Sequence, residues 1–138
     1  MITRETDYSM RLMVALAERY EKGIALASSA DVAQEMDIPY RFLRKLVHRL
    51  VVEDLIVSRR GKGGGVALTR KPSDITLLDI LTATGPKGIE LSPCVADPAG
   101  CRRSSICRFH KEFGRIQADI GRRLKAVRLS DLIEKTSK

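Results

Sequence analysis

The chain has 138 residues, a net charge of +8 and 43% hydrophobic residues. This length corresponds to one domain, and this composition excludes an intrinsically disordered chain. No apolar run approaches the length of a membrane span and the first residues lack a signal-peptide pattern, so we expect a cytoplasmic protein with no membrane partner.

Two helices are predicted in the first part of the chain. Apolar residues recur at helical spacing from Tyr8 to Arg19, and Thr6 or Asp7 can cap the start of that helix. Residues 28–36 predict a second, shorter helix that begins at a serine cap. A proline at position 39 then forces a turn, because the residue before a proline is pushed out of the α region.

The next predicted helix, residues 40–53, is basic and amphipathic. At 100° per residue its leucines fall on one face, whereas Arg41, Arg44, Lys45 and His48 fall on the opposite face. One face can therefore pack on a core while the other presents cations. A short helix, a tight turn and a basic amphipathic helix are the components of a helix-turn-helix.

A β-hairpin is predicted directly after the basic helix. Residues 55–60 and 66–69 have strand composition, and the connection Gly61-Lys62-Gly63-Gly64-Gly65 is rich in glycine. Taken alone, this glycine run would be a generic flexible turn. After a helix-turn-helix it predicts a wing, whose glycines let the tip approach a sugar-phosphate backbone closely.

The second half of the chain predicts a short helix, a loop and a long helix. Thr76 can cap a helix that ends near residue 85, and residues 85–105 show no persistent period. From residue 106 to 127, apolar residues recur on one narrow stripe, which suits a partner helix and favours a homodimer. The alternative is a helix that lies on its own domain. A final short helix is expected from Ser130. The apolar stripe of the long helix, residues 106–127, consists of Ile106, Phe109, Phe113, Ile116, Ile120, Leu124 and Val127.

Positive charge is concentrated in two blocks. Residues 38–71 carry nine basic and two acidic groups, and residues 102–128 carry the same numbers. A basic protein with clustered charge typically binds a polyanion such as nucleic acid, although a solvated basic face is the simpler alternative.

Three cysteines, Cys94, Cys101 and Cys107, lie in or next to the loop. An odd number of thiols argues against a disulfide framework, and their spacing disfavours a zinc knuckle. His110 follows Cys107 by one helical turn, so the two side chains can face one site. Three thiolates and one harder ligand suit an iron–sulfur cluster. Three unrelated cysteines remain the alternative.

Together, the order of these elements, the wing motif Arg60-Gly61-Lys62-Gly63-Gly64-Gly65 and the cysteine triplet resemble the dimeric winged-helix transcription regulators that include IscR, NsrR and RirA. The resemblance implies a homodimer whose long helices cross, and a 2Fe–2S or 4Fe–4S cluster held by Cys94, Cys101 and Cys107. His110 matches the histidine ligand found in IscR, and Asp7 matches the aspartate ligand found in NsrR. Arg44 stands where IscR carries a glutamate, so the IscR operator sequences do not transfer.

We therefore predict a mainly α fold with a small β-hairpin wing, in which a winged helix-turn-helix domain (1–84) precedes a cluster loop (85–105) and a dimerisation helix with a C-terminal helix (106–138). The predicted function is non-enzymatic: a transcriptional regulator whose affinity for a double-stranded DNA operator is switched by the cluster. Alternatives are a cluster-free thiol redox sensor and a small iron–sulfur electron carrier. The predicted DNA-binding residues are Tyr40, Arg41, Arg44, Lys45, His48, Arg59, Arg60, Lys62, Gly63 and Gly64.

Overall fold

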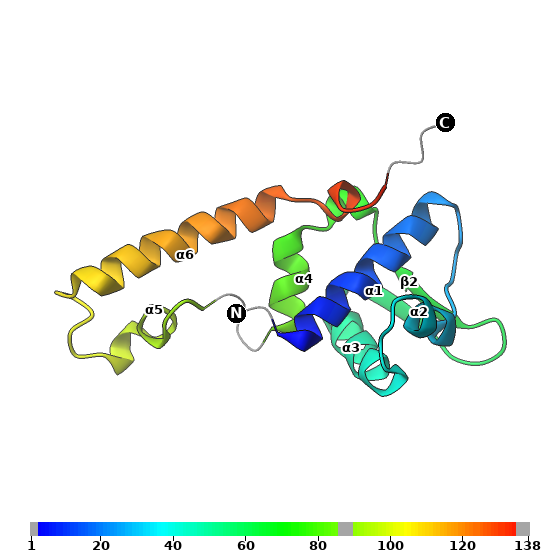
Figure 1. Cartoon of the computed structure of the whole chain (residues 1–138), viewed down its shortest axis with the longest axis horizontal. Helices are drawn as coiled ribbons and strands as arrows, with labels where there is room; N and C mark the ends of the chain where they lie inside the picture. Colours follow the sequence, from blue (N-terminus) through cyan, green and yellow to red (C-terminus); the bar gives the residue numbers. More distant parts are fainter. Residues whose placement is uncertain (1–2, 86–89, 135–138) are drawn as a thin grey trace.

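The computed structural model describes residues 3–85 and 90–134, and its described part is mostly helical with one two-stranded antiparallel sheet (Figure 1). The prediction of a mainly α fold with a β-hairpin is confirmed. The α-helices are α1 (Arg4–Glu21), α2 (Ser29–Glu35), α3 (Tyr40–Val52), α4 (Leu77–Thr84), α5 (Pro93–Ala96) and α6 (Arg108–Ala126). The strands are β1 (Ile56–Arg59) and β2 (Gly65–Leu68), and the 3-10 turns are η1 (Pro72–Asp74), η2 (Pro98–Gly100) and η3 (Leu129–Asp131).

Helix α1 begins earlier than the sequence predicts. Its N-cap is Thr3, whose side-chain oxygen accepts a hydrogen bond from the backbone N–H of Thr6 at 3.2 Å. The prediction of a cap at Thr6 or Asp7 is therefore wrong: both residues lie inside the helix, and Thr6 is buried. Acidic residues Glu5 and Asp7 in the first turn favour this start, because they face the positive end of the helix dipole.

The helix-turn-helix forms as predicted from α2 and α3. The Ser28 side chain caps α2 by accepting a hydrogen bond from the N–H of Asp31. Asp37 adopts a left-handed conformation with φ of 53°, and this reverses the chain before α3. The apolar face of α3 is buried, as its amphipathic pattern predicts, through Leu43, Leu46 and Leu50.

The wing is a short hairpin in which Ile56 pairs with Leu68 and Arg59 pairs with Gly65. Two of its glycines are required by the protein's own backbone. A Cβ atom on Gly64 would lie 2.2 Å from the Arg59 carbonyl oxygen, and one on Gly65 would lie 2.3 Å from that of Ala27. At these two positions the close approach is therefore intramolecular, which differs from the approach to DNA inferred from the sequence.

The C-terminal segment returns to the winged-helix core. Leu129 in η3 is fully buried, and its N–H donates to the Ile75 carbonyl at 2.8 Å. The N–H of Leu77 donates in turn to the Val127 carbonyl at 2.9 Å. The short helix expected from Ser130 is instead the single turn η3, and residues 135–138 lie outside the described part of the chain. Leu129 shares its core with residues that include Leu12, Met13, Leu16, Leu43, Leu50, Ile56, Val66, Ile75 and Ile80.

Helix α6 extends away from this core, with α5 beside its N-terminal half (Figure 1). The predicted loop is not irregular throughout, since it contains α5 and η2, while residues 86–89 lie outside the described ranges. The backbone N–H of Leu91 donates to the Gln117 side chain at 3.0 Å, which ties this segment to α6. No helix in residues 3–85 or 90–134 has the length and apolar character needed to cross a membrane.

Candidate nucleic-acid interface and cysteine segment

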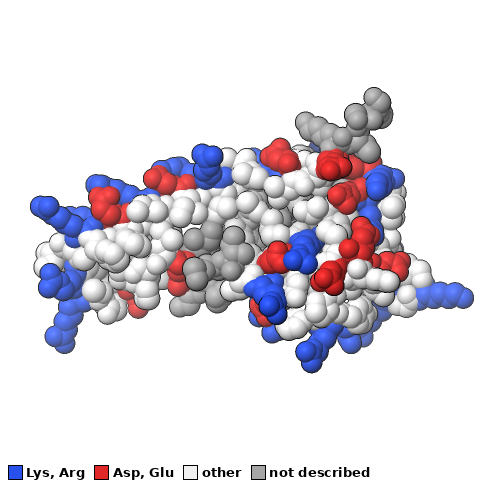
Figure 2. All heavy atoms as spheres, viewed as in Figure 1, with Lys and Arg blue, Asp and Glu red and all other residues white. Residues whose placement is uncertain are grey.

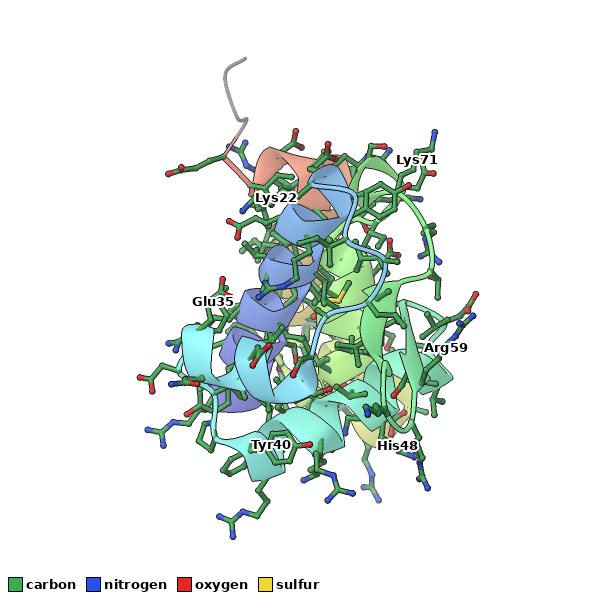
Figure 3. The ribbon with its side chains drawn as sticks, turned by 90° about the vertical axis from the view of Figure 1, so that its right-hand side faces the viewer. Lys22, Glu35, Tyr40, His48, Arg59 and Lys71 are labelled. Atoms are coloured by element: carbon green, nitrogen blue, oxygen red, sulfur yellow. The ribbon has the colours of Figure 1, made fainter. Side chains whose placement is uncertain are left out.

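A groove of about 780 Å³ lies between α3 and the wing. In Figure 3, Tyr40 and His48 lie along α3 and Arg59 lies on the adjacent hairpin. The structure thus brings together two regions that the sequence predicted separately to meet DNA. Six of the predicted DNA-binding residues line the groove: Tyr40, Arg44, His48, Arg59, Arg60 and Gly64.

The other four predicted DNA-binding residues lie outside this groove lining. Arg41 and Lys45 are exposed on α3, and Lys62 and Gly63 are exposed in the turn of the wing. The guanidinium of Arg41 lies 5.6 Å from the centre of the Phe42 ring, which restrains its position on α3. All four are accessible to a ligand that covers both α3 and the wing.

The groove lining also includes serines at the start of α2 that were not predicted to meet DNA. Ser28 and Ser29 line the groove together with residues of α3 and the wing. The available signal was the serine cap itself, because a helix-turn-helix places its first helix close to the nucleic-acid backbone.

An ion-pair network joins α3 to the first turn of α1. The Glu5 carboxylate contacts Lys45 Nζ at 3.3 Å through Oε1 and Arg49 Nη1 at 2.8 Å through Oε2. The hydrogen-bonded Lys45 ammonium, helped by the charge of Arg49, holds the pKa of Glu5 below its ordinary value, although desolvation opposes this. Glu5 is therefore ionised at neutral pH. Neither Glu5 nor Arg49 was predicted to have a role, because more than 40 residues separate them in the chain.

Asp7, the alternative cluster ligand, is also engaged in an ion pair. Its Oδ2 lies 2.8 Å from Arg11 Nη2, and Nη1 of the same guanidinium donates to the Met36 carbonyl at 3.2 Å. Met36 is the C-cap of α2, so this pair connects the start of α1 to the helix-turn-helix. The Asp7 side chain is about half exposed, at 49%.

The three cysteines occupy one continuous segment. Cys94 lies in α5, Cys101 directly follows η2, and Cys107 is the N-cap of α6. All three thiols are free and their residues are half-buried, and Cys94 Sγ lies 3.2 Å from Ser92 Oγ. Within the described ranges, however, no group of three His, Cys, Asp or Glu side chains comes together as a metal site. The three predicted cysteine ligands therefore lie in one segment, but their side chains are not brought together in one site.

His110 lies in the first turn of α6, one turn after Cys107. Its Nδ1 atom is buried and has no hydrogen-bond partner among the described residues. An unpaired buried polar atom is costly, so a ligand or an interacting group is expected there. This atom fits the donor chemistry of the predicted cluster, which needs a fourth ligand beside three thiolates.

Exposed cations flank the cysteines in the chain, and Figure 2 shows Lys and Arg gathered at the end of the molecule where α6 begins. None of them forms a salt bridge with another described residue. Positive neighbours favour the thiolate form of cysteine, which is the form that binds metal. The four cations nearest the cysteines in the chain are Arg102, Arg103, Arg108 and Lys111.

The apolar stripe of α6 is only partly covered in the described chain. No α6 residue is buried, and Phe109 and Ile116 are 56% and 45% exposed. The Phe109 and Phe113 rings stack on each other with centroids 4.1 Å apart. Helix α6 thus contacts α4 and α5 of its own chain, while Phe109 and Ile116 remain exposed to a further partner.

Comparison with known proteins agrees with this architecture. NsrR of Shouchella clausii, an HTH-type transcriptional regulator, is 30% identical over 112 residues, which cover 76% of this chain and 73% of that protein. The solved structure of T. potens IscR is 20% identical, with a TM-score of 0.74 over 96% of this chain and 85% of the other. The oxidised form of Staphylococcus aureus CymR is 25% identical, with a TM-score of 0.72 over 100% of this chain and 99% of the other.

The Rrf2 family, described as iron-dependent transcriptional regulators, matches residues 2–135. This match spans nearly the whole chain and includes the helix-turn-helix, the wing, the cysteine segment and α6. The protein is a DNA-binding transcriptional regulator rather than an enzyme, and it belongs to the Rrf2 family.

Proposed function

We propose that this regulator is a cytoplasmic homodimer whose affinity for a double-stranded DNA operator is switched by an iron–sulfur cluster bound to Cys94, Cys101 and Cys107. The observation that carries the proposal is the buried, unpartnered Nδ1 of His110, one turn after a cysteine in a segment that holds three free thiols. Exposed arginines around these thiols favour thiolates and would offset the negative charge of a cluster.

The proposed DNA interface consists of α3 and the wing. Arg44 and His48 would face the major groove, where arginine can pair with a guanine edge or hold a phosphate. Arg59, Arg60 and Lys62 on the wing would contact phosphates or the minor groove. The groove of about 780 Å³ between these elements supports this division of roles.

The proposed dimer interface is the apolar stripe of α6. A helix with a partly exposed apolar seam can bury the exposed part against a second helix, and an identical helix satisfies this requirement with two-fold symmetry. In such a dimer two winged-helix domains would bind two half-sites of one operator.

His110 is the preferred fourth ligand and Asp7 is the alternative. An imidazole ligand suits a 2Fe–2S site, and replacing a thiolate by histidine raises the reduction potential. The ion pair between Asp7 and Arg11 disfavours Asp7, because the carboxylate would have to leave a contact of 2.8 Å before binding iron. When bound, the cluster would supply a group that responds to redox state, nitric oxide or iron supply.

A second candidate function is redox sensing by the thiols alone. It is favoured by the absence of an assembled three-ligand site in the described ranges and by the similarity to CymR, which is known in an oxidised form. Direct oxidation of one of these half-buried thiolates by an oxidant such as a peroxide, which is itself reduced, would then give a sulfenic acid or a disulfide in place of cluster chemistry.

Iron and acid-labile sulfide analysis of anaerobically purified protein distinguishes the two candidates. Cluster binding predicts both elements in the wild type and their loss in Cys101→Ala. Absence of iron and sulfide from wild-type protein, even after reconstitution, would leave only the thiol sensor.

The fourth ligand is tested by the visible spectra of His110→Ala and Asp7→Ala. His48→Ala, which changes the only other histidine, and Asp31→Ala, at an exposed position of α2, are the matched controls. We expect the spectrum to change in His110→Ala alone. A changed spectrum in Asp7→Ala, with the spectrum of His110→Ala unchanged, would instead identify Asp7 as the fourth ligand.

A further inference from the structure

Glu5 contacts Lys45, the one cation of α3 that belongs to both the proposed DNA face and the ion-pair network with α1. Lys45 follows Arg41 by four residues, so both side chains lie on the same exposed face of the helix. The Lys45 side chain is 58% exposed, and its salt bridge within the described residues is the one to Glu5, at 3.3 Å. The ammonium group can therefore reach either the carboxylate or an approaching phosphate.

Arg49 differs from Lys45 in how it is held. Its Nη1 atom donates both to Glu5 Oε2 at 2.8 Å and to the Thr84 carbonyl at 3.2 Å. Thr84 ends α4, so Arg49 links three helices and keeps a partner when Glu5 loses its charge. The structural connection therefore rests on Arg49, whereas the pair between Glu5 and Lys45 is long, solvent-exposed and free to exchange.

We propose that Glu5 competes with DNA phosphate for Lys45 and thereby lowers the affinity of the winged helix for DNA. This inference rests on the proposed DNA interface of α3. When DNA binds, the Lys45 ammonium must exchange its carboxylate partner for a phosphate. The loss of the ion pair with Glu5 offsets part of the free energy gained from the new contact between Lys45 and the phosphate. Glu5 is thus a positioning residue that sets the strength of binding without touching DNA.

The effect of this exchange of partners on DNA affinity can be predicted. Exposed ion pairs are worth a few tenths to about 1 kcal/mol, which corresponds to about a two- to fivefold change in affinity for each protomer. A lysine that is free to pair with a DNA phosphate also displaces one more counterion from the DNA. The slope of log affinity against log salt should therefore become steeper by as much as about 0.9 per protomer.

The test is Glu5→Gln in the full-length protein, measured by anisotropy on a labelled DNA duplex of arbitrary sequence over a range of salt concentrations. We expect tighter binding than wild type, with a steeper salt slope and an unchanged unfolding temperature. Glu5→Asp keeps the charge and shortens the side chain, so it should shift affinity in the same direction by a smaller amount.

Two comparisons separate this effect from a general change in charge. Glu21→Gln removes the same charge from the far end of α1 and should change affinity less (Figure 1). In a Lys45→Ala background, Glu5→Gln should give no gain. An equal gain in that background, an equal effect of Glu21→Gln, or no gain at all would overturn the proposal. Wild-type protein without salt-dependent duplex binding would instead refute the DNA interface, and this inference with it.

Discussion

Arg44 is the residue on which the proposed base recognition depends most. It is exposed, it lines the groove between α3 and the wing, and it makes no salt bridge with another described residue. Arg44→Ala should weaken specific DNA binding by about 1–3 kcal/mol if the guanidinium reads a guanine. The unfolding temperature of Arg44→Ala should match that of wild type, because the Arg44 side chain lies opposite the buried leucines of α3.

Arg115→Ala provides the control for Arg44→Ala, since Arg115 is 74% exposed on α6 and far from α3 in sequence. The affinity of both variants is measured at one fixed salt concentration. Equal affinities would mean that Arg44 does not meet DNA.

Gly64 is the wing residue with the least room for a side chain. A Cβ atom 2.2 Å from the Arg59 carbonyl forces the hairpin to shift, and overpacking of this kind costs about 1–3 kcal/mol. Gly64→Ala should therefore lower both the stability and the DNA affinity. Gly114→Ala, where nothing lies within 4 Å of the added carbon, should leave the fold intact in the same unfolding measurement. A Gly64→Ala protein as stable as wild type would contradict the hairpin geometry.

Local patterns explain which elements could be predicted from the sequence. The opposed apolar and basic faces of α3, the serine cap of α2 and the capping box of Thr76 and Asp79 all act within a few residues. These elements formed as predicted. The start of α1 was misplaced because Thr3, Thr6 and Asp7 are all acceptable caps, and the hydrogen bond to Thr3 decides among them.

The site depends on contacts between distant residues, and these were less predictable. Glu5 lies 40 residues from Lys45 and 44 from Arg49, so no short motif signals their network. The groove combines α2, α3 and the hairpin, and only the order of these elements pointed to it. The cysteine spacing suggested ligands, but spacing does not specify whether one chain alone can gather them.

The apolar stripe of α6 makes a prediction about assembly. Phe113→Glu places a charge in the proposed seam, where burial without a partner is costly, so the protein should become monomeric. The change should be visible by sedimentation or light scattering. Ala118→Glu adds the same charge at an exposed position of the same helix, and this variant should remain dimeric. A folded Phe113→Glu dimer would place the interface elsewhere.

The C-terminal segment of the chain completes the hydrophobic core of the winged-helix domain. Because Leu129 is fully buried in the shared core, with η3 packed on α1 and η1, the winged-helix domain needs a residue that comes after the proposed dimerisation helix. Leu129→Ala should lower the free energy of unfolding by about 2–5 kcal/mol, as for other buried leucines. Leu132→Ala, at a position 39% exposed, should cost far less. Equal effects in chemical denaturation would show that the segment does not belong to the core.

The central claim is that the state of the cysteine segment in the dimer changes DNA affinity. It is tested most directly by the dissociation constant of wild-type protein for one duplex, selected by the protein from a random pool, measured anaerobically before and after removal of iron. We predict a difference of about fivefold or more, the size of a typical coupling between two sites, with Cys101→Ala matching the iron-free value. Identical dissociation constants for iron-loaded and iron-free wild-type protein, at equal salt and reductant, would contradict the account.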